Sequence, residues 1–198
     1  MSGWIKHSDF WQAAADLLRR GAGASAHPFA LPTLCTVGPT CVPRPRKVVL
    51  RAVNSDTTML RTYTDRRSVK ATHLKEGSEA SYVFWDPNQQ LQLMTGGPTS
   101  WASEEEADAV FAGLPKHGRK AYATEAAPGT PLPSPGSGLP PDWEERDKEA
   151  TDFARDHFGI LVTTLRWADV LHLDRGGNTR MAGTRPLNGD WTWEWVVP

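Results

Sequence analysis

Short β-rich runs follow one another along most of the chain, and they constrain the fold more than any other feature. The first five cover residues 31–37, 46–53, 59–64, 80–85 and 91–95. Two pairs of these runs are separated by Asn54-Ser55-Asp56 and Asp86-Pro87-Asn88, which have the chemistry of tight turns. Two antiparallel hairpins are therefore expected in the first half of the chain.

The second half continues the same pattern. Further strands are expected at residues 160–167, 169–174, 179–182 and 191–197, with Gly176-Gly177 as a turn. Strands outnumber helices and arrive as consecutive hairpins. The sequence therefore predicts a mainly β fold with flanking helices, an antiparallel barrel rather than a doubly wound parallel sheet.

Three segments have helical patterns. Residues 8–20 place apolar side chains at helical spacing and are followed by Gly21 and Gly23, which predicts an N-terminal amphipathic helix. Ser103-Glu104-Glu105-Glu106 is a capping box and predicts a helix start. Asp142-Trp143-Glu144-Glu145 predicts the start of another helix that ends at Gly159.

Residues 126–141 contain six prolines together with glycines and serines. Such a composition does not bury enough apolar surface to form a core of its own. We expect a surface excursion from a single domain that spans residues 1–198.

Composition excludes several classes of function. The 22 basic and 23 acidic residues nearly cancel, so no global field favours nucleic acid or an anionic membrane. Cys35 and Cys41 are too few for a disulfide framework, and no zinc-ligand spacing surrounds them, so no metal site is expected. Residues 1–7 lack an unbroken apolar stretch, and no run of about 18 apolar residues occurs. We expect a cytoplasmic protein.

The strongest chemical signal is a cationic hairpin. Residues 43–51 and 62–71 carry five arginines and two lysines around apolar strand positions. Such charges must be solvated, paired or neutralised by an anion. Ser68 stands at a potential helix N-cap before residues 69–74, where its hydroxyl, backbone amides and Lys70 would converge on a phosphate. The alternative is that these charges belong to solvated strand edges and turns.

The order of these residues resembles the FMN-phosphate segment of the pyridoxamine 5'-phosphate oxidase family. An arginine with a cation five residues later is followed by a turn, by Tyr-Thr and by Ser-x-Lys-Ala, and these residues are Arg46, Arg51, Tyr63, Thr64, Ser68, Lys70 and Ala71. Residues 191–195 resemble the family's last strand, and residues 176–180 its penultimate turn. The resemblance covers residues 31–99 and 158–198. It implies an FMN-binding split β-barrel of antiparallel strands, with FMN as cofactor.

The resemblance also implies roles for single residues. Arg46 and Arg51 would contact the phosphate and ribityl chain, and Ser68 and Lys70 the phosphate. The other implied flavin neighbours are Val48, Val49, Leu50, Tyr63, Thr64 and Val69, the last standing where an arginine is usual. Gln92 would donate to the flavin from a partner subunit, and Arg180 would contact a substrate. Because Arg46 and Arg51 lie on opposite faces of an ideal strand, both reach one ligand only at a bulge or strand end.

At other positions, this chain lacks the polar side chains with which the family binds its substrate. Val110, Leu114 and Gly118 stand where the family binds the substrate phosphate, and Ala182 replaces a histidine. The resemblance thus implies an FMN-dependent oxidoreductase for a small-molecule substrate other than pyridoxamine phosphate, with no catalytic residue assigned. Two alternatives remain: a flavin carrier or sensor without turnover, and a barrel that binds haem or a deazaflavin.

Tryptophans mark the last predicted strand. Trp191, Trp193 and Trp195 share one face by the two-residue period of a strand. A half-open barrel with such a strand leaves apolar area that a two-fold partner can cover. We expect these indoles in the core and in a homodimer interface.

Overall fold

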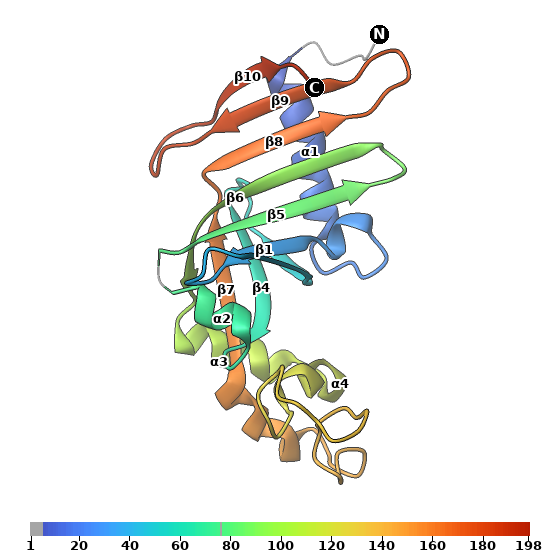
Figure 1. Ribbon diagram of the computed structural model, residues 1–198, viewed down its shortest axis with the longest axis vertical. Helices are drawn as coiled ribbons and strands as arrows, with labels where there is room; N and C mark the ends of the chain where they lie inside the picture. The colour runs from blue at the N-terminus through green and yellow to red at the C-terminus, as the bar shows by residue number, and fades with distance from the viewer. Residues whose placement is uncertain (1–5, 76) are drawn as a thin grey trace.

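The computed structural model describes residues 6–75 and 77–198. Most of residues 1–7, on which the expected cytoplasmic location partly rests, therefore lie outside the described residues. In the described chain, ten strands join in one strongly curled antiparallel sheet (Figure 1). They are β1 (Thr33–Val37), β2 (Pro43–Lys47), β3 (Leu50–Val53), β4 (Met59–Asp65), β5 (Glu79–Asp86), β6 (Leu91–Trp101), β7 (Phe158–Thr164), β8 (Trp167–His172), β9 (Thr179–Thr184) and β10 (Thr192–Val196).

The helices lie around this sheet. The α-helices are α1 (His7–Gly21), α2 (Val69–His73), α3 (Glu104–Gly113) and α4 (Lys116–Arg119). The 3-10 helices are η1 (Pro28–Ala30), η2 (Lys120–Tyr122) and η3 (Glu149–His157). This arrangement confirms the predicted mainly β split barrel with flanking helices. None of the helices in the described ranges combines the length and apolar character that a bilayer-spanning helix requires.

The sheet turns a corner within β6. Its first part pairs with β8 and its last three residues pair with β7, so one strand belongs to both halves of the barrel. The corner contains Gly96 and Gly97. A Cβ at Gly96 would overlap the Ala80 carbonyl oxygen, and one at Gly97 would overlap that of Thr164. Glycine is therefore required where the backbones of the two halves approach.

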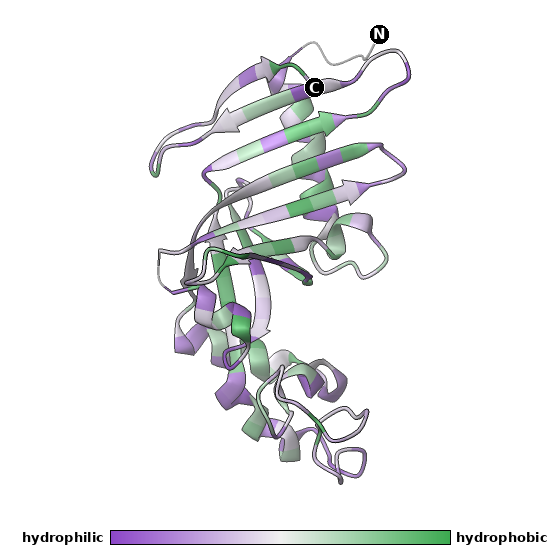
Figure 2. Ribbon diagram, viewed as in Figure 1, coloured by the Kyte–Doolittle hydropathy of each residue, from purple (hydrophilic) through white to green (hydrophobic). Residues whose placement is uncertain are grey.

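The main core lies between the sheet and α1. Hydrophobic residues gather where the strands pass over α1 (Figure 2). Trp191 and Trp193 stack on each other and on Trp11 of α1, with ring centroids 4.8–5.0 Å apart. Trp195 stacks on Phe10 at 5.7 Å. The predicted shared face is confirmed, and α1 of the same chain packs against it, while Trp195 remains 41% exposed. The expected homodimer stays a prediction.

Gly183 makes this aromatic packing possible. It pairs with Trp193 across β9 and β10, and a Cβ at Gly183 would overlap the Trp193 indole. Gly183→Ala is expected to lower the free energy of unfolding by about 1–3 kcal/mol, because overpacking displaces the ring. Chemical denaturation measures this loss. Gly113→Ala is the control, since nothing lies within 4 Å of the Cβ added there, and equal stability losses in both variants would contradict the prediction.

A second core lies under β4 and β7. Ala107 and Phe111 of α3, Tyr122, Trp143 and Phe158 belong to it. Ser103 caps α3 as predicted, since its hydroxyl accepts the Glu106 amide at 3.1 Å, but the Glu106 carboxylate pairs with Arg61, so the second half of the capping box is not formed.

The helix predicted from Asp142 to Gly159 is wrong. Only Glu149–His157 is helical, and it is a 3-10 helix. Before it, the amides of Trp143 and Glu145 donate to the carbonyls of Pro140 and Asp142, respectively. These successive turns bury Trp143 in the second core, which an α-helix on the surface would not do.

Candidate functional site

A cavity of about 300 Å³ lies beside the cationic hairpin. The connection from β2 to β3, strand β4, helix α2 and the segment after α4 form its walls. The lining residues are Lys47, Val48, Val49, Arg51, Tyr63, Thr64, Asp65, Lys70, Ala121, Tyr122 and Pro128. Two separate parts of the chain therefore meet at the segment that the sequence singled out.

The structure sorts the cations of the hairpin into three groups. Arg44 is solvated. Arg66 pairs with Glu104 at 2.7 Å and lies over the Trp101 ring. Arg67 binds the Asp65 carboxylate at 2.7 Å. The third group comprises Arg46, Lys47, Arg51 and Lys70, and none of these four forms an ion pair within the described parts of the chain.

Arg46 and Lys70 form a half-buried cationic pair. The Arg46 guanidinium donates to the Thr36 hydroxyl at 2.6 Å, and Thr36 also contacts His73 Nδ1 at 3.1 Å. Burial lowers the pKa of Lys70, and the neighbouring charge of Arg46 lowers it further. Burial also lowers the pKa of Arg46. Both cations are held at an energetic cost that an anion between them would offset.

Ser68 is the N-cap residue of α2, as predicted, but its side chain makes no capping hydrogen bond. Its hydroxyl donates to the Asp65 carbonyl at 2.7 Å and accepts from Lys70 Nζ at 3.1 Å. Thr64 Oγ1 lies 3.4 Å from the same hydroxyl. Ser68 thus orients Lys70, while Val69 is 56% exposed and does not line the cavity.

The predicted strand from Arg46 to Val53 is interrupted. Lys47 ends β2, Leu50 begins β3, and the register of β3 against β4 shifts between Leu50 and Ala52. This break supplies the irregularity that Arg46 and Arg51 require if both are to reach one ligand. Arg51 lies over the Tyr63 ring at 5.2 Å.

Three apolar residues lie between β2 and the start of β3, and they have different surroundings. Val48 and Val49 line the cavity. The Leu50 side chain is buried in the main core, which leaves only its backbone near the site.

The wall formed by residues 121–128 was missed from the sequence. Arg67 positions it, since its guanidinium donates to the Thr124 carbonyl at 3.0 Å and to the Thr124 hydroxyl at 3.1 Å. The excursion after Ala126 therefore begins at the cavity rather than away from it, with Pro128 in the lining. Arg119, the last residue of α4, is buried. The chain carries no local motif for this wall.

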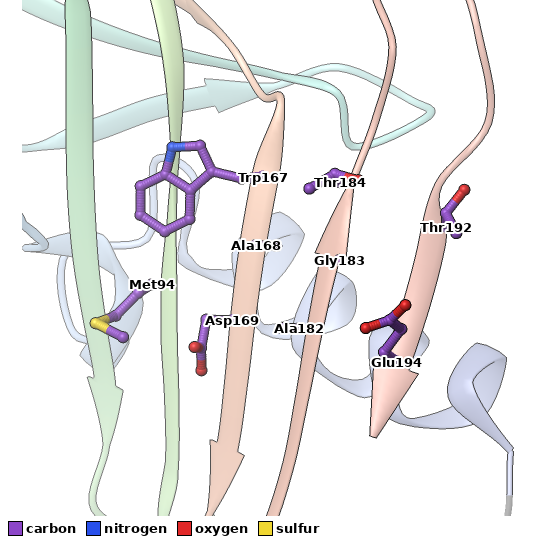
Figure 3. Close-up of a pocket in the computed structure, with 9 residues that line it drawn as sticks. All are labelled: Met94, Trp167, Ala168, Asp169, Ala182, Gly183, Thr184, Thr192 and Glu194. Atoms are coloured by element: carbon purple, nitrogen blue, oxygen red, sulfur yellow. The ribbon is translucent and has the colours of Figure 1, made fainter. Parts of the chain in front are cut away.

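Gln92 and Arg180 lie elsewhere, on the face of the sheet opposite α1. A second cavity of about 350 Å³ on this face is lined by Met94, Trp167, Asp169, Glu194 and their neighbours (Figure 3). Arg180 binds the Asp169 carboxylate at 2.7–3.1 Å, and this contact raises the pKa of Arg180. Gln92 precedes Met94 by two residues on β6. Neither residue lines the cationic cavity of its own chain, so a role for Gln92 and Arg180 in that site stays a prediction.

The chain is similar to one known protein family and to several solved structures. The model of the pyridoxamine 5'-phosphate oxidase FMN-binding domain matches residues 10–101. A pyridoxamine 5'-phosphate oxidase-related, FMN-binding protein from Nostoc punctiforme PCC 73102 aligns over 100% of both chains, with 23% identity and a TM-score of 0.72. PhzG from Burkholderia lata 383, solved with tetrahydrophenazine-1-carboxylic acid, covers 96% of this chain and 90% of its own, with 17% identity and a TM-score of 0.67. No curated protein matches.

Proposed function

We propose that the chain is a divergent member of the pyridoxamine 5'-phosphate oxidase family, whose FMN-binding domain matches residues 10–101, and that it binds FMN through the phosphate and works as an FMN-dependent oxidoreductase. The observation that carries this proposal is the cavity beside Arg46 and Lys70, two half-buried cations without an ion-pair partner in the described ranges. A phosphate dianion is the part of FMN that such a pair attracts.

The remaining lining fits the rest of the cofactor. Lys70, oriented by Ser68, and Arg46 hold the phosphate. Val48, Val49 and the Tyr63 ring offer apolar surface, and Arg51 supplies a donor beside Tyr63. FMN supplies hydride transfer when bound, so the chain's own residues need only bind, orient and exclude water.

Pyridoxamine phosphate does not fit as the substrate. Val110 and Leu114 pack against the second core, and Gly118 and Ala182 have no side-chain donor. The substrate is a small molecule of another kind. We further propose a homodimer in which Gln92 and Arg180 of a second copy complete the flavin site, an assembly that light scattering tests.

A non-catalytic flavin carrier is the second candidate, because the carboxylate of the lining, Asp65, is held by Arg67, and Lys70 is assigned to the phosphate. Anaerobic titration of FMN-loaded protein with NADH or NADPH separates the two functions. Bleaching of the flavin band and its return in air support an oxidoreductase. A flavin that stays bound and oxidised through such titrations and a substrate screen supports a carrier. The absorbance spectrum of protein purified with its native cofactor also distinguishes FMN from haem or a deazaflavin.

FMN affinity is expected to fall both toward acidic and toward alkaline pH, which gives its pH profile an acidic and an alkaline limb. Below about pH 6 the phosphate loses its second charge, so affinity falls as pH falls. Burial lowers the pKa of Lys70 in the free protein, and the negative charge of a bound phosphate raises it again. FMN binding therefore takes up a proton at alkaline pH. Affinity therefore also falls as pH rises through the free-protein pKa of Lys70.

Titrations of FMN against wild type and Lys70→Met across this range check both limbs. The variant should lose the alkaline limb and keep the acidic one. Riboflavin, which has no phosphate, should show neither limb. An alkaline limb that persists in Lys70→Met would assign it to another group.

A further inference from the structure

Tyr122 is a buried tyrosine whose hydroxyl has no hydrogen-bond partner in the described parts of the chain. Its side chain is only 4% exposed and lines the cationic cavity, yet its hydroxyl makes no hydrogen bond to any described residue. Buried tyrosine hydroxyls usually find a partner. Tyr82, which lies away from this cavity, follows the rule, since its hydroxyl contacts Thr163 Oγ1 at 3.1 Å. The Tyr122 hydroxyl differs from that of Tyr82, because it is not sealed in a core but opens into the cavity, where it is accessible to an acceptor on a ligand.

The electrostatic surroundings of this hydroxyl place it within the cavity. The charges that act on it belong to Arg51, Tyr63 and Asp65, whereas those that act on Lys70 belong to Arg46 and Asp65. Tyr122 thus belongs to the η2 wall of the cavity, near Arg51, and Lys70 to the α2 wall, near Arg46. Burial raises the pKa of Tyr122 to about 12, so the group is a neutral donor at physiological pH. The Asp65 carboxylate is already occupied by the Arg67 guanidinium and amide.

The rest of Tyr122 is held firmly. Its carbonyl lies 2.9 Å from His157 Nδ1, and its ring packs edge-on against Phe158 at 4.9 Å. The neighbouring Thr124 is tied to β4 through Arg67. A fixed ring and a free hydroxyl are what a preorganised ligand contact requires.

We propose that Tyr122 is a ligand-binding residue whose hydroxyl donates to an acceptor in the part of the molecule that FMN and riboflavin share, the ribityl chain and ring. This inference rests on the FMN binding proposed above. The phosphate belongs to Lys70 on the α2 wall of the cavity, which leaves the uncharged oxygens and nitrogens of the flavin for Tyr122 on the η2 wall.

Tyr122→Phe tests this role when FMN and riboflavin are titrated in parallel. The variant should raise both dissociation constants by the same factor, roughly two- to tenfold, because one neutral hydrogen bond is lost. Lys70→Ala should weaken FMN much more than riboflavin. The ligand-free melting temperature of Tyr122→Phe should stay equal, because the hydroxyl that the substitution removes makes no hydrogen bond with a described residue.

Tyr82→Phe is the matched control. It removes the contact with Thr163, so it should lower the melting temperature and leave both affinities unchanged. The inference is overturned by unchanged affinities in Tyr122→Phe, by a loss for FMN alone, or by a weakened affinity that accompanies a lower ligand-free melting temperature. Wild-type protein that binds neither flavin would overturn the proposed function itself.

Discussion

Replacing Arg46 or Lys70 by alanine is expected to raise the FMN dissociation constant by roughly ten- to a hundredfold in each case. Each substitution removes a charge-assisted contact of about 1.5–3 kcal/mol with the phosphate. The two cations are half-buried and influence each other, so the double variant should lose less than the product of the single losses. Flavin fluorescence titration measures all three variants.

Arg44→Ala is the matched control for these variants. Arg44 lies on the same strand as Arg46 but is exposed, and its loss should change the dissociation constant by less than a few-fold. Arg66 is unsuitable as a control because it pairs with Glu104 and packs on Trp101. If Arg44, Arg46 and Lys70 variants all behave alike, the hairpin acts only as a diffuse positive field.

Arg119→Met is expected to lower the free energy of unfolding by about 3 kcal/mol. The Arg119 side chain is 2% exposed and lies over the Phe111 ring at 4.3 Å. Its guanidinium donates to the Lys148 carbonyl at 2.8 Å, Thr151 Oγ1 at 3.1 Å, Asp152 Oδ1 at 2.7 Å and the Phe111 carbonyl at 3.3 Å. Methionine keeps most of the apolar stem but loses these hydrogen bonds, of which those to Thr151 Oγ1 and the Phe111 carbonyl are buried.

The adjacent Lys120 provides the control. Lys120 and Glu144 form an exposed pair, so Lys120→Met should cost less than about 1 kcal/mol. Urea unfolding compares the two variants. Because Arg119 holds η3 against α3, its loss should also loosen the wall that carries Tyr122 and weaken FMN binding. Equal stability of the two variants would show that Arg119 is not the link between these elements.

The parts of the fold that depend on local chemistry were predictable from the sequence. Asn54 forms its turn through its own side chain, which accepts the amides of Thr58 and Met59 at 2.7–2.8 Å. Asp86 does the same for Asn88. Such contacts span a few residues, so the residue types in the turn already indicate the hairpin.

The parts of the site that depend on distant partners were not predictable. Three arginines occur in similar cationic runs of the sequence but differ in their surroundings. Arg44 is solvated, Arg46 belongs to the half-buried pair, and Arg67 binds Thr124, which is 57 residues away along the chain. The same holds for Tyr122, whose place in the cavity depends on that contact. The composition of residues 126–141 predicted a surface excursion. It did not indicate that Pro128, within this segment, lines the cavity.

Parallel titration of the purified, flavin-free protein with FMN and riboflavin tests phosphate-anchored flavin binding most directly. Binding through Arg46 and Lys70 predicts that FMN binds at least roughly tenfold more tightly than riboflavin, and that Arg46→Ala and Lys70→Ala reduce this ratio. Equal affinity for the two flavins, or no binding of FMN, would contradict a phosphate site at this hairpin.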